Sequence, residues 1–424
     1  MSIPFELART TFRLLRRHWP PLVALVLAGY VADAWLLRGV VEIGIRNHVL
    51  GLSLLSPLVV VQLVVVVAMF HVLRPSLPSL TAAIEKPADA ATPTGADRFT
   101  AVLALALVPF FAYYAAWGFL GETIREYSLA GLSRDPFGKN GPLLDTGKSY
   151  GLLISVGASW LLRRYAKARE ARKHSPWWQT LIVLCEANWV FIGLFVVTRW
   201  KDAAMKWLES RVVWQYLGGA DPAADVAPPV LAEGWPTLVD ALTNAGQGVF
   251  FAALLPIVWL ALTALIFGRD LSEKTLLATD RRLERVVTGY DALPSLVRRF
   301  GDDLVKGYRS RYVPVANSVR LTLHAGLPLL LAFCVGYRGL EWLSAQAWIG
   351  ATHLIGPHPI DFWRAAGDAL ALVVGGPLGT PSIVFEPLRI CLLAATLELG
   401  VAAWVRRREP APPAEDATAQ PQAV

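Results

Sequence analysis

Residues 51–72 read "GLSLLSPLVVVQLVVVVAMFHV", a stretch that contains no Asp, Glu, Lys or Arg. A helix of this length covers about 33 Å, which matches the hydrocarbon core of a lipid bilayer. The apolar residues are contiguous and are not spaced at the interval of one helix face. This stretch therefore predicts a transmembrane helix, and it decides the class of the protein.

Apolar blocks of similar length recur along the rest of the chain. Of its 424 residues, 54% are hydrophobic and only 17% are charged, whereas a soluble domain carries about a quarter charged residues. The sequence predicts an all-α integral membrane protein with about eight transmembrane helices. The predicted spans are residues 20–38, 51–72, 99–120, 149–162, 177–198, 246–268, 321–340 and 382–404.

Arginine-rich segments mark one side of the predicted bundle. They lie before the first span and after the fourth, sixth and eighth spans, at residues 9–17, 163–173, 281–311 and 406–408. Because Lys and Arg collect in cytoplasmic loops, both termini are predicted to be cytoplasmic, in the inner membrane of a bacterium. The net charge of +7 is explained by this orientation signal. The lipid bilayer is therefore a predicted partner, and nucleic acid is not.

Three regions are predicted along the chain. Residues 1–19 form a basic amphipathic helix in the plane of the membrane, with apolar residues on one face and Arg9, Arg13 and Arg16 on another. The apolar residues of that face are Phe5, Ala8, Phe12 and Leu15. Residues 20–408 form a polytopic membrane domain, which includes an amphipathic cytoplasmic loop, 269–320. Residues 409–424 are polar and rich in proline, and they are predicted to be disordered.

Two predicted spans leave the membrane with similar sequences. Residues 29–35, GYVADAW, share Gly, Tyr and Trp with residues 336–342, GYRGLEW. Each odd-numbered span also continues into an aromatic-rich segment, so the sequence predicts four tandem helical hairpins with outer interfacial helices. Chance similarity between Trp-rich segments is the alternative. The apolar run 369–374 is too short to cross a membrane and is predicted to be re-entrant or interfacial.

Polar residues inside the predicted spans are the candidate binding residues, because their burial in a bilayer is costly. They are Glu186 and Asn188 in the fifth span, and Glu386, Arg389 and Glu398 in the eighth. No nucleotide-binding, metal-binding or nucleophile motif occurs, so no catalytic residue, metal or cofactor is predicted.

The positions of these residues suggest their roles. Glu186 has no basic residue at a matching depth in another predicted span, so we expect it to be protonated and to donate a hydrogen bond to another helix. Asn188 is two residues away and is expected on a different face. Glu386 and Arg389 lie one helical turn apart and are expected to form a pair. For each of them, ordinary hydrogen bonding between helices is the alternative role.

Three functions remain open. The first is binding or movement of a small molecule, an ion or a lipid, or service as an accessory membrane subunit of such a process. The second is a non-transporting scaffold or sensor that docks a cytoplasmic protein through residues 269–320. The third is an intramembrane lipid-processing enzyme, with His48, His353, His358 and Asp361 gathered at the outer face. Transport further predicts that polar residues of the fifth and eighth spans converge on one cavity.

Overall fold

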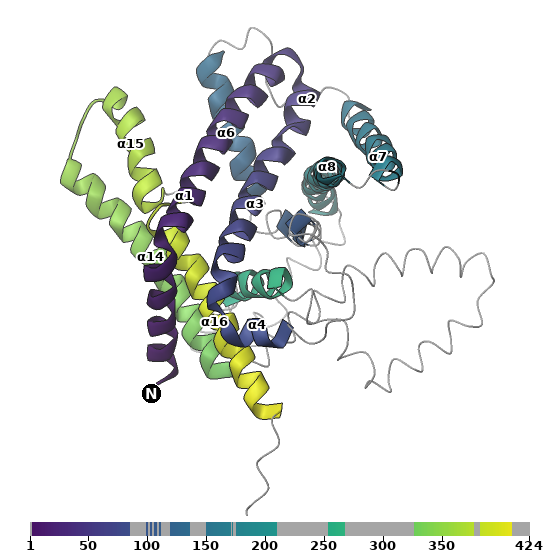
Figure 1. Ribbon diagram of the computed structural model, residues 1–424. Coiled ribbons are helices and arrows are strands. Elements are labelled where there is room, and N and C mark those ends of the chain that lie inside the picture. Colours follow the sequence, from purple (N-terminus) through teal and green to yellow (C-terminus); the bar gives the residue numbers. More distant parts are fainter. Residues whose placement is uncertain are drawn as a thin grey trace, which may run out of the picture.

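The computed structural model describes residues 2–84, 99–100, 102–103, 106–107, 110–111, 119–135, 150–170, 172, 175–209, 253–267, 326–376 and 382–408. The regular structure of these residues is helical throughout (Figure 1). The elements are α1 (Ile3–Arg46), α2 (His48–Ser53), α3 (Leu55–Leu73), η1 (Arg74–Ser76), α4 (Pro78–Ile84), α6 (Phe119–Arg134), α7 (Tyr150–Glu170), α8 (Pro176–Glu209), α14 (Leu327–Ile355), α15 (Ile360–Val374) and α16 (Phe385–Arg408). A further short helix covers Ala253–Phe267.

The all-helical class predicted from the sequence is confirmed, and helices suited to cross a membrane are present. Within the described part of the chain, three helical segments are long and apolar enough to cross a membrane. They are Ile3–Arg46, His48–Ser76 and Phe385–Arg406. The predicted loop 269–320, the tail 409–424 and most of the predicted span 99–120 lie outside the described residues.

Helices α1 and α3 pack side by side, and α16 contacts both (Figure 1). α1 approaches α3 closely at Gly29, where an added Cβ atom would lie 2.7 Å from a methyl carbon of Val65. The side chains of Leu58, Leu63 and Phe70 on α3 are fully buried. A small residue in α1 thus lets two apolar helices pack closely, which is a usual source of stability between membrane helices.

The N-terminal segment is continuous with the first predicted span. α1 includes Pro20 and Pro21, so no break in the helix separates residues 3–19 from that span. Its buried face carries Leu7, Thr11 and Leu14, whereas Phe5 and Phe12 are exposed. The spacing of apolar residues in the sequence suggested that Phe5 and Phe12 lie on the face that is covered. In the structure the chain covers the opposite face of the helix, which carries Leu7, Thr11 and Leu14.

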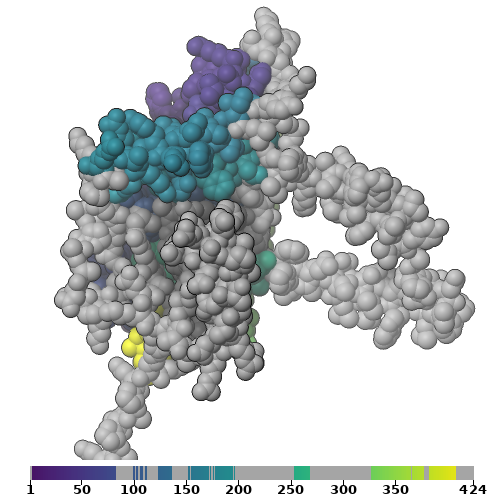
Figure 2. Space-filling view, turned by 90° about the vertical axis from the view of Figure 1, so that its right-hand side faces the viewer, coloured from purple at the N-terminus to yellow at the C-terminus, as the bar shows by residue number. Residues whose placement is uncertain are grey.

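Helices α7 and α8 form an antiparallel pair that packs along its length. This pair contains the predicted spans 149–162 and 177–198, and α7 continues beyond the predicted end of its span. Figure 2 shows the pair as a teal band directly beneath the purple residues near α2, and α2 contacts both helices. The polar candidates of the fifth span therefore lie where α7, α8 and the start of α3 meet.

The short apolar run 369–374 belongs to a helix. Residues 369–374 form the end of α15, which packs against α14 and is otherwise largely exposed. In Figure 1, the hairpin of α14 and α15 projects away from α2, α7 and α8, and the lower end of α15 lies beside the upper end of α16. The end of α15 therefore lies next to the beginning of α16.

Candidate functional site

Glu186 has a cationic partner, contrary to the sequence-based prediction. Its carboxylate atom Oε1 lies 2.6 Å from Nη2 and accepts a hydrogen bond of 2.8 Å from Nε of Arg163 on α7. Glu186 is buried, and the Arg163 side chain is 22% exposed. The premise of that prediction, that no basic residue reaches Glu186, is wrong, because α7 extends past residue 162 and carries Arg163 alongside α8.

Asn188 faces the same helix as Glu186, although the sequence predicted different faces. Its amide Nδ2 donates hydrogen bonds to the hydroxyls of Ser159, at 2.6 Å, and Ser155, at 3.2 Å. The hydroxyl of Ser53 lies 2.6 Å from that of Ser155, and Ser56 donates weakly to Asn188 Oδ1 at 3.5 Å. Asn188 thus joins α7, α8 and the beginning of α3, as expected for a polar side chain that links membrane helices.

The sequence carries a signal for these partners on α7. Ser155, Ser159 and Arg163 follow one another at intervals of four residues and therefore share one face of α7. Ser155 and Ser159 lie within an otherwise apolar predicted span and Arg163 directly follows it, and together they supply partners for Glu186 and Asn188. We call the contact between these three residues and α8 the α7–α8 polar seam.

Glu398 binds the backbone at the start of another helix. Its two carboxylate oxygens accept hydrogen bonds from the amides of Ser79, at 2.7 Å, and Leu80, at 3.0 Å. These amides belong to the first turn of α4, where backbone N–H groups have no partner within the helix. Glu398 therefore attaches α16 to the segment that follows α3.

Glu386 and Arg389 form the predicted pair on the first turn of α16, with a separation of 2.6 Å. The guanidinium of Arg389 also lies over the ring of Trp259, 4.9 Å from its centroid. Glu386 is 10% exposed and Arg389 is 27% exposed at their side chains. These groups place charge, an aromatic face and partial access together at the beginning of α16.

The last four backbone carbonyls of α15 each accept a hydrogen bond from the protein. Gly375 N donates to Ala371 O at 2.8 Å, and the hydroxyl of Ser344 donates to Val374 O at 2.6 Å. The amides of Ile383 and Val384 donate to the carbonyls of Leu372, at 2.8 Å, and Val373, at 3.3 Å. A helix that ends in water has no need of such partners, whereas one that ends in an apolar layer does.

The α15–α16 junction, defined as Ser344, Gly375, Ser382, Glu386 and Arg389, lies part-way along the bundle. Glu398 contacts α4. Along α16, the distance from its first residue, Phe385, to Glu398 is about 20 Å. α3 covers about 28 Å from its beginning to the level of α4. Figure 1 likewise shows the upper end of α16 well below the upper end of α3. The junction is thus not level with the end of α3 that joins α2.

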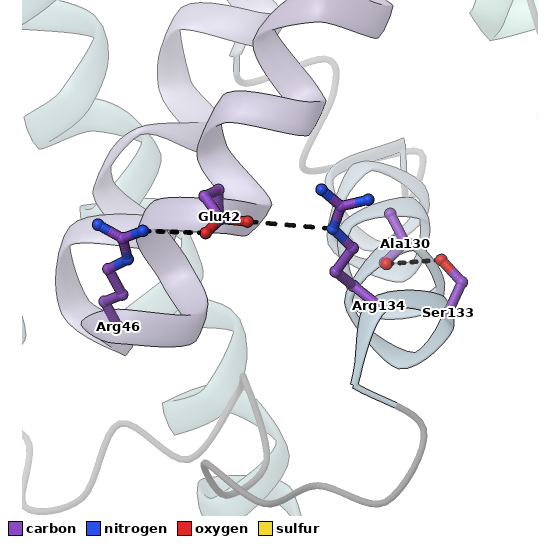
Figure 3. A network of polar contacts seen from close by, with 5 residues as sticks. All are labelled: Glu42, Arg46, Ala130, Ser133 and Arg134. Carbon is purple, nitrogen blue, oxygen red and sulfur yellow. Dashed lines mark hydrogen bonds and ion pairs between the residues drawn. The ribbon is translucent and has the colours of Figure 1, made fainter.

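Tyr127 holds α6 against the end of α1 and against α2. The phenol of Tyr127 is fully buried, and its oxygen would clash with a Cβ atom added at either Gly44 or Gly51. Burial raises the pKa of Tyr127 to about 12. At the exposed edge of this contact, Glu42 lies 3.1 Å from Arg46 and 4.0 Å from Arg134 (Figure 3). Exposed pairs contribute little, so Tyr127 packing is the main attachment of α6.

The five predicted site residues do not converge on one place. Glu186 and Asn188 bind α7, Glu398 binds α4, and Glu386 and Arg389 lie at the α15–α16 junction. A shared cavity of the fifth and eighth spans, which simple transport predicted, is not formed by these groups.

Comparison of the chain with known protein families, with curated proteins and with solved structures finds no match. The function must therefore be argued from the geometry of the chain itself.

The histidines predicted for an outer enzymatic site are not gathered. His48 begins α2, whereas His353 and His358 lie at the end of α14 and before α15, on the opposite side of the view in Figure 1. The ring of His358 stacks on Phe362 at 4.3 Å between centroids. In the part of the chain that the structure describes, no three His, Cys, Asp or Glu residues are grouped as metal ligands would be.

Proposed function

We propose that this protein binds or moves a small molecule, an ion or a lipid within the membrane, or serves as the membrane subunit of such a process. The α15–α16 junction is the proposed ligand site. The observation that carries the proposal is the interruption between α15 and α16, part-way along the bundle, with the last four carbonyls of α15 bonded by protein groups. Non-helical backbone at membrane depth is tolerated where it is buried or lines a cavity, and transporters build sites from such discontinuous helices.

The polar groups at the junction support a polar or charged ligand. Glu386, Arg389 and the Ser344 hydroxyl come from two helices, and Trp259 supplies an aromatic face beneath the guanidinium. Glu186 and Asn188 are assigned a structural role, because each already binds α7. The proposal thus shifts the functional centre from the fifth span to the eighth.

The proposal includes eight spans in four hairpins, with both termini cytoplasmic in a bacterial inner membrane. Described helices overlap the first, second, fourth, fifth, sixth, seventh and eighth predicted spans. The packing of α1 against α3, with α2 between them in the chain, supports the first of the hairpins. The arginines in the last part of α7 and those that end α16 support the orientation.

Thiol accessibility tests the ligand site. In the full chain with Cys185, Cys334 and Cys391 replaced by Ala, Ser344→Cys should react in membrane vesicles with the charged reagents MTS-ethylammonium and MTS-ethylsulfonate. Ser56→Cys is the matched control, because Ser56 is buried in the α7–α8 polar seam. If Ser344→Cys reacts no faster than Ser56→Cys from either side of the membrane, the junction holds no polar ligand and the proposal fails.

A scaffold is the second candidate function. In the α7–α8 polar seam, Glu186 and Asn188 bind α7, and Glu398 binds α4. These contacts between helices are those of a closed bundle, which a scaffold predicts. The docking loop proposed for it, 269–320, lies outside the described residues. Failure of Ser344→Cys to react would favour this function.

A further inference from the structure

One line of α1 alternates aromatic and basic side chains. Phe5, Arg9, Phe12, Arg16 and Trp19 follow one another at intervals of four and three residues, which places them along one side of a helix. All five are exposed, and the three aromatic residues are exposed to 55, 62 and 56%. We call this set the aromatic–arginine line. Such exposure of three large rings in succession requires a contact that the described chain does not provide.

The opposite side of the same helical segment is held by the protein. Leu7, Thr11 and Leu14 are buried, and the imidazole Nε2 of His18 lies 2.7 Å from the hydroxyl of Ser76 in η1. These contacts fix the rotation of α1 about its own axis. The aromatic–arginine line is therefore directed outward by packing and is not free to turn inward.

The same side of α1 continues into its apolar part. Leu27, Tyr30 and Val31 extend the line at helical spacing, and all three are exposed. In the most apolar stretch of α1, only 11% of the residues are buried within the protein, whereas 61% are buried in the corresponding stretch of His48–Ser76, which contains α3. α1 thus lies at the edge of the bundle, and the face that contacts lipid in the span is continuous with the aromatic–arginine line.

The length of α1 brings this line to the membrane surface. Its 44 residues cover about 66 Å, roughly twice the thickness of the hydrocarbon core. The predicted span begins at residue 20, so the segment from Phe5 to Trp19, about 21 Å long, leaves the hydrocarbon at Trp19. Transmembrane helices are tilted by about 20° on average, and a tilt of α1 toward the aromatic–arginine line brings that line nearer to the headgroups.

The charge of this segment selects an anionic surface. Arg13 and Arg17 are also exposed, Glu6 is the one acidic residue between Ile3 and Trp19, and Arg406 of α16 is exposed as well. Arg side chains pair with lipid phosphates, and aromatic rings settle at the headgroup level. We propose that the aromatic–arginine line binds the headgroups of anionic phospholipids in the leaflet that faces the N-terminus. Each arginine near such a surface strengthens binding about fivefold.

Spin labelling of the full chain tests this contact. A nitroxide on Phe12→Cys, with the native cysteines replaced by Ala, is measured in nanodiscs of phosphatidylcholine alone or with about a third phosphatidylglycerol, a composition chosen to give a negative surface potential. We expect the label to become accessible to oxygen and protected from aqueous nickel chelate only in the anionic nanodiscs. The combined change Arg9→Gln, Arg13→Gln and Arg16→Gln should abolish this shift.

The matched control removes three exposed arginines from the other end of α1 and from α6, as Arg38→Gln, Arg46→Gln and Arg134→Gln. It changes the net charge equally and should leave the shift intact. The proposal is overturned if the label stays aqueous in both nanodiscs, or if both triple variants abolish the shift equally. Dipolar broadening between labels, in place of a lipid-dependent shift, would assign the line to a second copy of the chain and would also overturn it.

Discussion

The guanidinium of Arg163 approaches Glu186 through two nitrogens, and both contacts converge on the same carboxylate oxygen. Glu186 is buried, whereas Arg163 lies near the end of α7 and remains partly exposed. A buried carboxylate is costly without a partner, and its partner here comes from the neighbouring helix of an antiparallel pair. The ion pair therefore fixes the register of α7 against α8.

A double-mutant cycle tests this pair. Arg163→Gln should lower the free energy of unfolding by about 3 kcal/mol, since it leaves the buried Glu186 carboxylate without its counterion. Glu186→Gln should lower it by less, because the Arg163 side chain left behind is partly exposed. The double variant should lose less than the sum of the two single changes. Unfolding of the purified chain by SDS in mixed micelles measures all four proteins. Purely additive losses would show that the two side chains do not interact.

Gly44 is predicted to tolerate no side chain. A Cβ atom there would meet the phenol of Tyr127, and its distance to the ring carbon Cζ would be 2.9 Å. Gly44→Ala should therefore lower the free energy of unfolding by about 2 kcal/mol through overpacking. Gly39→Ala is the control on the same helix, because nothing lies within 4 Å of its Cβ position. It should leave stability unchanged or raise it by up to about 1 kcal/mol, and equal effects of both changes would contradict the packing of α6 described above.

The buried phenol of Tyr127 predicts a dependence of stability on alkaline pH. Its pKa is about 12 in the folded chain, whereas a tyrosine in an unfolded chain has a pKa of about 10. The contribution of the phenol is fully present below pH 10 and is lost as pH rises toward 12, because only the unfolded state releases the proton in this window. The difference in stability between pH 9 and pH 11 should be smaller for Tyr127→Phe than for the unchanged chain. An identical pH response of Tyr127→Phe and the unchanged chain would reject a buried phenol.

Removal of the Glu398 carboxylate should release the first turn of α4. Its oxygens accept hydrogen bonds from two backbone amides, and a hydrogen bond to a charged group contributes about 1.5 to 3 kcal/mol. In Glu398→Leu, hydrogen exchange of the amides of Ser79 and Leu80 should accelerate about tenfold or more, the factor that corresponds to 1.4 kcal/mol. Mass spectrometry of peptides from residues 77–84 reports this change. Glu341→Leu removes a partly exposed carboxylate on α14 and should leave these amides unaffected.

The proposed orientation places the ends of α6 and α7 on opposite sides of the membrane. Ser133 and Ala168 are both exposed. With the native cysteines replaced, a membrane-impermeant maleimide applied to intact cells should label Ser133→Cys but not Ala168→Cys. After the cells are broken, both should react. Labelling of Ala168→Cys in intact cells would reject the eight-span topology.

The sequence by itself determined the membrane class and the polar candidates. Contiguous apolar blocks such as residues 51–72 specify transmembrane helices because their length must match the hydrocarbon, independently of their neighbours. The Glu386–Arg389 pair was also predictable, since two residues one turn apart on a helix meet whatever surrounds them.

Only the tertiary structure decided which groups meet between elements. Arg163 reaches Glu186 because α7 continues past its apolar part and runs antiparallel to α8, and neither helix encodes that register locally. Glu398 meets α4 across more than 300 positions of sequence, and Ser344 meets the end of α15 because α14 and α15 fold back on each other. Local periodicity fixes the faces of a helix, but the neighbour that covers each face is chosen by packing of the whole chain, as the exposed Phe5 and Phe12 demonstrate.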